Sequence, residues 1–176
     1  KLAFDQHLVA MHKIKGLPVN IIRPSNCVVA GQQLHRIVPK SLISGLTRRR
    51  IPLHGGGVAR KSYLHATDLS KAVMTVIKGG SMGEIYNVGP DKPTAIADVV
   101  KMCLIASGGS WDELVELSAE RTGQDSCYWL DSSKLKSLGW KQEISLPDGI
   151  ELVLKWIKAY PELLEMDTSF TMRAWN

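Results

Sequence analysis

The 176-residue sequence lacks long apolar segments, clustered cysteines and low-complexity repeats. No apolar run approaches the roughly 18 residues that a membrane-spanning helix needs, so we expect no membrane segment. Only three cysteines occur, widely spaced and without paired metal-ligand spacing, which favours a reducing, cytoplasmic location and no metal site. The opening residues form a charged amphipathic stretch, so we expect no signal peptide there. What remains is a globular protein of about one domain.

Complete nucleotide-binding motifs are also missing. The sequence has no Gly-x-Gly-x-x-Gly after a predicted strand and no phosphate-binding P-loop. Gly55, Gly56 and Gly57 follow a short predicted strand but open no helix, so a turn is the better interpretation. His7 and His12 lie five residues apart, which is not the spacing of a zinc-binding helical pair. Spacing alone therefore identifies no complete catalytic constellation.

The charge balance is basic. Lys and Arg number 22 against 17 Asp and Glu, which gives a formal charge of +5. This excess suits an anionic partner, whether a nucleic acid, an anionic membrane or a phosphorylated small molecule, and it equally suits a basic solvated surface. The densest run, Arg48 to Arg50, ends a predicted helix, where it complements the helix dipole, and has no interleaved aromatic residues. We therefore expect neither nucleic-acid nor membrane binding.

Predicted strands and helices alternate along the chain. Apolar spacing predicts one helix that ends at Gly16 and others over 36–50, 67–79, 94–106, 132–138 and 146–160. Strands are predicted over 18–23, 51–53, 61–66, 84–89 and 114–119. Thr67 and Thr94 are expected to cap the helices that follow them, and Asp68 is expected to be a helix-capping acid rather than a catalyst. The alternation indicates the α/β class.

Seven short segments then occur in an order that resembles one known family. They are KLAFDQH, GLPVNIIRPSN, RIVPKSLISGL, IPLHGGG with KSYLHATDLSKAV, IYNVG, RTGQD, and LDSSKLKSLGWKQEISLPDGI. Together they resemble the C-terminal half of the extended short-chain dehydrogenase/reductases, the NAD-dependent epimerase/dehydratase family that acts on nucleotide sugars, and in particular its dTDP-glucose 4,6-dehydratases. The resemblance covers about residues 1 to 160.

The resemblance implies a fold. It predicts the C-terminal part of a doubly wound, Rossmann-like sheet plus a small α/β substrate-binding domain. Residues 1–34, interleaved with 51–80, would be the last part of the dinucleotide-binding domain. Residues 35–50 and 81–160 would form the substrate-binding region, followed by a tail over 161–176.

The resemblance also implies roles for individual residues. Lys1 occupies the lysine position of the family's catalytic Tyr-x-x-x-Lys pair, where the ammonium lowers the pKa of the tyrosine and bonds the nicotinamide ribose. Pro24 follows the strand whose end faces the nicotinamide. Substrate-binding positions are matched by Asn26, Arg36, His54, Lys61 (or Arg60, with a one-residue slip), Asn87 and Arg121. Of these, Asn26, Arg36 and Lys61 would meet the diphosphate, His54 would stack on the base, and Asn87 and Arg121 would contact the nucleotide.

The implied parent protein is an NAD- or NADP-dependent nucleotide-sugar dehydratase or epimerase that oxidises the sugar transiently at C4 and pairs as a homodimer. The 176 residues alone would be inactive, because they lack the glycine-rich fingerprint and the tyrosine. Departures from the family pattern leave alternatives open: Asn26 is followed by CVVAG, and Thr122 and Ser126 replace a proline and an arginine. The two alternatives are a carbonyl reductase of the same family and a non-catalytic nucleotide-sugar-binding fragment.

Overall fold

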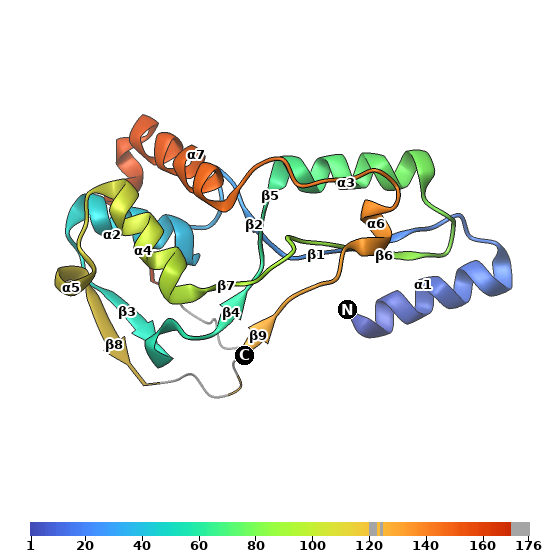
Figure 1. Cartoon of the computed structure of the whole chain (residues 1–176), viewed down its shortest axis with the longest axis horizontal. Coiled ribbons are helices and arrows are strands. Elements are labelled where there is room, and N and C mark those ends of the chain that lie inside the picture. Colours follow the sequence, from blue (N-terminus) through green and yellow to red (C-terminus); the bar gives the residue numbers. More distant parts are fainter. Residues whose placement is uncertain (120–122, 124, 170–176) are drawn as a thin grey trace. The chain divides into compact units, whose positions relative to one another are not determined.

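The computed structural model describes residues 1–119, 123 and 125–169. The chain divides into two compact units (Figure 1). Unit 1 comprises Lys1–Cys27, Ser62–Pro93 and Trp129–Ser145, and unit 2 comprises Val28–Lys61, Thr94–Tyr128 and Leu146–Asn176. These boundaries differ from the expected ones, since 81–93 and 129–145 fall in unit 1, and 28–34 and 51–61 fall in unit 2. The assignment of one unit to the dinucleotide and the other to the substrate stays a prediction.

Unit 1 is built on two parallel strands, β1 (Ile21–Pro24) and β6 (Ile85–Val88), paired in register from Ile21 opposite Ile85 to Pro24 opposite Val88. Its helices are α1 (Leu2–Lys15), α3 (Ala66–Gly79) and the short α6 (Ser133–Lys136). A second pair joins β2 (Asn26–Val28) and β5 (Tyr63–His65). Parallel pairing with helices between the strands agrees with the expected α/β class.

The pleat of β6 sorts its side chains between two faces. Tyr86 and Val88 are buried in the unit 1 core, whereas Ile85 and Asn87 point to the other face and are only half-buried. The core comprises Leu64, Ala72, Val76, Tyr86, Val88, Leu135 and Trp140. Ile85 instead lines a hollow beside α1. Figure 1 accordingly shows α1 and α3 on opposite sides of the β1–β6 pair. Because side chains alternate along a strand, Asn87 shares the α1 face with Ile85.

Unit 2 packs three helices, α2 (Ile37–Thr47), α4 (Ile96–Ser107) and α7 (Leu146–Ala159), with two small sheets. In one sheet, β3 (Ile51–His54) lies parallel to β8 (Val115–Ser118). In the other, β4 (Arg60–Lys61) lies between β7 (Thr94–Ala95) and β9 (Cys127–Tyr128). Short helices complete the unit: η1 (Gly55–Gly57), α5 (Trp111–Leu114) and η2 (Pro161–Leu164).

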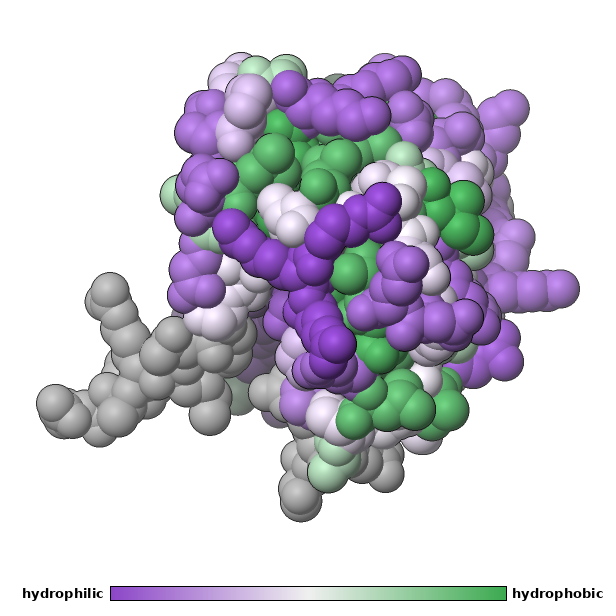
Figure 2. All heavy atoms as spheres, turned by 90° about the vertical axis from the view of Figure 1, so that its left-hand side faces the viewer, coloured by the Kyte–Doolittle hydropathy of each residue, from purple (hydrophilic) through white to green (hydrophobic). Residues whose placement is uncertain are grey.

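The core of unit 2 lies between these helices and the β3–β8 pair. One cluster of this core comprises Ile51, Leu53, Val100, Leu104 and Leu114. Helices α2 and α7 bury further apolar side chains, among them Leu42, Ile43, Ile150, Val153, Leu154 and Ile157. On the face of the molecule seen in Figure 2, an apolar area is surrounded by hydrophilic side chains. No helix in the described part of the chain is both long and apolar enough to cross a membrane.

Most predicted elements are present, and two predicted caps are wrong. Helix α3 begins at Ala66 with His65 as its N-cap, and the ring of His65 accepts a hydrogen bond from the Thr67 amide (3.2 Å). Helix α4 is capped by Ala95 without a side-chain bond, because Thr94 belongs to strand β7 and pairs with Lys61. The predicted helix end at Gly16 is confirmed by its left-handed backbone, with φ 67°. Strand β2 (Asn26–Val28) is not among the predicted strands.

Asp68 has a structural role, as the sequence predicts, but it does more than sit in the first turn of α3. Its carboxylate is fully buried and accepts hydrogen bonds from the amides of Glu143 (3.2 Å) and Ile144 (3.0 Å). Its carbonyl accepts a bond from Trp140 Nε1 at 3.0 Å. Asp68 therefore anchors residues 140–144 of unit 1 to α3.

Replacing Asp68 with Asn should destabilise the protein by about 1–3 kcal/mol, because the buried side-chain NH₂ would then face one of the two amides that now donate to the carboxylate. The free energy of unfolding in urea measures the loss. Asp98→Asn is the matched control, since Asp98 also lies in the first turn of a helix but is exposed. It should change stability by less than about 0.5 kcal/mol. Equal effects of the two substitutions would contradict the anchoring role.

Two neighbouring glycines of η1 offer a second test. Gly57 has φ 68°, and an added Cβ would lie 2.8 Å from the backbone nitrogen of Ala97. Gly56 has φ 63°, but an added Cβ would meet nothing within 4 Å. Both alanine substitutions suffer left-handed strain, and only Gly57→Ala also forces α4 to move. Thermal unfolding should show Gly57→Ala to be the less stable variant by more than about 1 kcal/mol.

Candidate functional site

The carboxyl ends of β1 and β6 gather polar groups. In open α/β sheets, ligands bind outside these ends of parallel strands. Register places Arg23 opposite Asn87 and Pro24 opposite Val88, and the Ser25 amide then donates to the Val88 carbonyl at 2.8 Å. The two strands therefore bring Pro24 and Asn87, two of the residues singled out from the sequence, to adjacent positions.

Asn26 is held by the chain entering β5. Its backbone amide and its Nδ2 both donate to the Ser62 carbonyl, each at 3.1 Å. The side chain thus bonds a distant segment and makes no local turn of its own. Nδ2 carries two hydrogens and this contact uses one of them. The second is a fixed donor of the kind that a phosphate oxygen accepts.

Three buried polar atoms near these strand ends have no partner among the described residues: Ser25 Oγ, Ser62 Oγ and Asn87 Oδ1. Buried polar side chains are normally hydrogen-bonded, so these atoms represent unused bonding capacity. The surrounding backbone is well fixed, since Ser132 Oγ accepts from the Gly89 amide (2.8 Å) and donates to the Gly89 carbonyl (3.0 Å). The strand ends thus combine a rigid frame with unpaired donors and acceptors, which is what a polar ligand requires.

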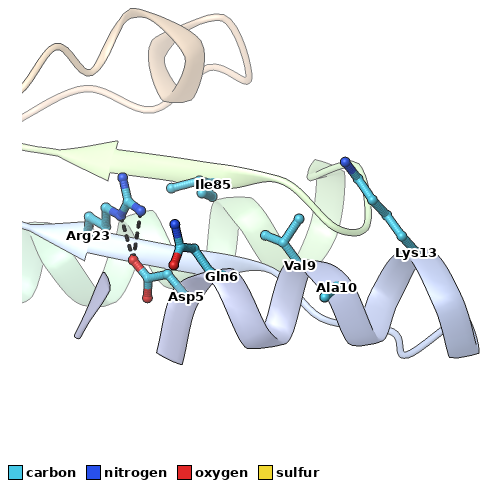
Figure 3. Close-up of a pocket in the computed structure, with 7 residues that line it drawn as sticks. All are labelled: Asp5, Gln6, Val9, Ala10, Lys13, Arg23 and Ile85. Carbon is cyan, nitrogen blue, oxygen red and sulfur yellow. Dashed lines mark hydrogen bonds and ion pairs between the residues drawn. The ribbon is translucent and has the colours of Figure 1, made fainter. Parts of the chain in front are cut away.

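Lys1 lies at the start of α1, as its N-cap, with an exposed side chain. The Asp5 amide donates to the Lys1 carbonyl at 3.0 Å, and the Asp5 carboxylate receives Arg23 Nε at 2.8 Å and Nη2 at 2.7 Å. Figure 3 shows the side chains of Asp5 and Arg23 pointing toward one another from α1 and β1. They border a hollow of about 360 Å³. Its lining is Asp5, Gln6, Val9, Ala10, Lys13, Arg23 and Ile85.

The remaining residues singled out from the sequence lie in unit 2 on separate elements. Arg36 is the exposed N-cap of α2, and Lys61 is half-buried on β4 between Thr94 and Tyr128. Arg60, the alternative to Lys61, is exposed. Arg121 lies outside the described residues. Of the cations singled out from the sequence, unit 2 thus holds Arg36 at the start of α2 and Lys61 on β4.

His54 ends β3, and its ring is tied to the neighbouring strand. Nδ1 lies 3.2 Å from the Ala119 carbonyl and 3.0 Å from Ser118 Oγ. A carbonyl only accepts, so we assign the hydrogen to Nδ1, which leaves Nε2 of the neutral ring as an acceptor. The imidazole is therefore oriented by β8 before any ligand arrives.

Neither Cys27 nor Cys103 is suited to nucleophilic chemistry. Burial raises the pKa of the Cys27 thiol above its ordinary value and that of Cys103 to about 12. Both remain protonated at neutral pH, whereas the thiolate is the reactive form. Among the residues that the structure describes, no group of three or more His, Cys, Asp or Glu side chains could hold a metal ion.

These pKa shifts predict an order of alkylation. Iodoacetamide at pH 8 should modify the exposed Cys127 first, Cys27 more slowly and Cys103 last, because a raised pKa leaves less thiolate at that pH. Peptide mass spectrometry over time measures the three rates. Raising the pH to 9.5 should accelerate Cys27 while the fold persists. Modification of Cys103 at the rate of Cys127 would contradict the burial.

The sequence did not identify Ser25, Ser62, Asp5 or Arg23 as members of the site. A signal existed for Ser25, which lies in Pro-Ser-Asn, and for Asp5, an acid one helical turn after Lys1. Nothing in the sequence pairs Asp5 with Arg23, because a turn of unknown geometry separates the helix from the strand.

Comparison with known proteins decides the family. The model of the NAD dependent epimerase/dehydratase family matches residues 1–89, just over half of the chain. The chain belongs to the NAD-dependent epimerase/dehydratase family. Both this family and the α/β fold class were expected from the sequence, and both are confirmed.

Curated members of the epimerase/dehydratase family extend the match. The chain is 28% identical to dTDP-glucose 4,6-dehydratase of Streptomyces niveus, over 90% of this chain and 47% of that protein. It is 32% identical to the mouse dTDP-D-glucose 4,6-dehydratase, over 80% of this chain and 41% of that protein. A trifunctional UDP-glucose 4,6-dehydratase of Arabidopsis thaliana is 28% identical over 92% of this chain and 24% of its own length. The chain thus spans between a quarter and a half of these relatives.

Solved structures of the family give the same result. The dTDP-glucose 4,6-dehydratase DesIV of Streptomyces venezuelae, with NAD and TYD bound, matches with a TM-score of 0.85 and 28% identity. The match covers 92% of this chain and 50% of that one. The Bacillus anthracis dTDP-glucose 4,6-dehydratase in complex with NAD matches with a TM-score of 0.83 and 26% identity, over 90% of this chain and 50% of that one.

Proposed function

We propose that the chain is part of an NAD(P)-dependent nucleotide-sugar 4,6-dehydratase or epimerase and is inactive alone. The observation that carries this proposal is the set of unpaired polar atoms beside Asn26 at the carboxyl ends of β1 and β6. It lies where sheets of this class bind ligands, in a chain whose solved relatives include complexes with NAD. In this proposal the basic charge of the chain matches an anionic nucleoside diphosphate.

The residues of unit 1 fit a dinucleotide. Pro24 would face the nicotinamide, and the orphaned Ser25 Oγ next to it supplies a hydrogen-bonding group at the same strand end. Lys1 would donate to a ribose hydroxyl. Its ammonium would also lower the pKa of a tyrosine placed before it, so that the phenolate takes a proton from the sugar hydroxyl. Hydride transfer to and from the sugar C4 is the chemistry that NAD or NADP supplies when bound.

The proposal assigns a substrate-binding role to individual residues. Asn26 Nδ2, the guanidinium of Arg36 and the ammonium of Lys61 would meet the diphosphate, because cationic and amide donors match its oxygens. The oriented ring of His54 would stack on the base. Asn87 would accept a hydrogen bond from the nucleotide with its unpaired Oδ1. Arg121 is proposed as a further nucleotide contact.

A carbonyl reductase of the same family is the second candidate. It is favoured by the segment after Asn26, where Cys27 and Val28 form strand β2 and the next residues depart from the family pattern. Pairing of two copies through α1 is proposed for either enzyme, since α1 has no buried residue and exposes Leu2, Phe4 and Ile14. A cytoplasmic location also stays a prediction.

Binding of dTDP and UDP tests the proposal. In calorimetric titrations of the natural polypeptide, Asn26→Ala and Arg36→Gln should each weaken binding at least about tenfold, since each removes a phosphate donor. Arg48→Gln is the control and should leave binding unchanged, because this exposed arginine faces Glu113 at 3.7 Å. Unchanged affinity in both test variants would rule out the nucleotide-sugar function and favour the reductase.

Two further measurements on the natural polypeptide complete this test, its mass and its turnover. Intact mass and N-terminal sequencing should give a mass well above 19.4 kDa, the mass of these 176 residues. That polypeptide should convert dTDP-glucose or UDP-glucose with NAD into a 4-keto or C4-epimeric sugar. A natural polypeptide of 19.4 kDa would contradict the enzyme and leave at most a binding fragment.

A further inference from the structure

A partly buried ion pair connects the first turn of α1 to the middle of β1. Arg23 Nε and Nη2 both donate to Asp5 Oδ2, at 2.8 and 2.7 Å. The Asp5 side chain is only 18% exposed and that of Arg23 38%. Two donors that converge on one shielded oxygen fix the direction of the guanidinium. They also make this ion pair more stabilising than an exposed one.

The rest of α1 is held loosely, which makes this pair important for the orientation of the helix. No residue of α1 is buried, and Asp5 borders an open hollow beside Val9 and Ile85. Figure 3 shows the pair at one end of this hollow, with the apolar side chains of Val9 and Ile85 further along it. A shallow apolar contact lets a helix slide or rotate, because dispersion is not directional. A hydrogen-bonded ion pair removes that freedom at the point where it acts.

The pair joins two segments that carry proposed active-site residues. On the helix side, the Asp5 amide bonds the Lys1 carbonyl at 3.0 Å, so that fixing Asp5 fixes the backbone of Lys1. On the strand side, Arg23 directly precedes Pro24, and the Ser25 amide is tied to Val88. The lysine side chain is long and flexible, so the place of its ammonium depends on where its backbone is anchored.

We propose that Asp5 and Arg23 are positioning residues, which hold the backbone of Lys1 at a fixed place relative to the carboxyl end of β1. This rests on the proposed function, because only there does Lys1 act on a cofactor and a tyrosine. Neither side chain touches the reacting atoms. Their effect is on geometry, and small displacements of a reacting group cost up to about a hundredfold in rate.

The test uses Asp5→Asn, which keeps the shape and removes the charge, and Asp5→Glu, which keeps the charge on a longer side chain. The matched control is Glu116→Gln. Glu116 pairs with Arg50 at the same 2.7 Å, but that pair is exposed and joins β8 to the residue that precedes β3 in unit 2. Thermal unfolding of every variant identifies any that fail to fold.

The first measurement is hydrogen exchange of the amides in residues 5–8, the first that α1 protects, made on the 176-residue chain and on the natural polypeptide. Asp5→Asn should speed this exchange at least tenfold while the amides of α3 keep their wild-type rates. Asp5→Glu should restore most of the protection, and Glu116→Gln should have no effect on α1. Wild-type exchange in Asp5→Asn, or acceleration throughout unit 1, would overturn the proposal.

The second measurement is turnover of the natural polypeptide. Asp5→Asn should lower kcat at least tenfold with KM changed less than twofold, because binding contacts remain while the lysine is displaced. The acid limb of its kcat/KM profile should move to higher pH, since a more distant ammonium lowers the tyrosine pKa less. Normal kcat with faster exchange would overturn the positioning role. Absence of activity in the wild type would overturn the proposed function, while the exchange data would still decide whether the pair holds α1.

Discussion

The parallel pairing of β1 with β6 determines where Arg23, Ser25 and Asn87 lie at the candidate site. One register puts Arg23 beside Asn87 and brings Ser25 to the Val88 carbonyl. A shift of one residue would turn Asn87 into the core, where Tyr86 and Val88 now pack, and would expose those apolar side chains instead. The buried face therefore protects the register, and the register in turn fixes the site. The burial of Tyr86 and Val88 therefore also fixes the positions of the polar residues at the site.

The two faces of this strand pair are held with different strength. Toward α3 the face is a continuous apolar core, reinforced by the Asp68 carboxylate and its bonds to residues 143 and 144. Toward α1 it offers Ile85, Asn87 and Arg23 to a helix without a buried residue. On this second side the buried Asn87 Oδ1 has no partner among the described residues, and the side chain of Arg23 is partly exposed. The side that tolerates imperfect packing is also the side where ligand chemistry is proposed, as is common for sites placed on a rigid scaffold.

The sequence was informative about elements and less so about their junctions. Periodicity located α1, α3 and α7 because each has an apolar stripe or a clear glycine stop, and the order of seven short motifs identified the family. Caps were harder to predict. Thr94 is a good capping residue by type, but it pairs with Lys61 between strands β7 and β4 and so belongs to a strand. Ser62 contributes its carbonyl to Asn26, and a carbonyl carries no side-chain signature. The Asp5–Arg23 pair depends on the angle between a helix and a strand, which tertiary packing sets.

Each unit is assembled from three separate stretches of sequence, and the last stretch of unit 1 ends only at Ser145. Neither unit can be isolated by a single cut in the polypeptide, because the stretches of one unit alternate along the sequence with those of the other. The order of synthesis has a related effect. A growing chain that has passed Pro93 already contains both strands of the β1–β6 pair, yet Leu135, Trp140 and the partners of Asp68 have still to emerge. The unit that begins first must therefore wait for most of the other before its own core can close.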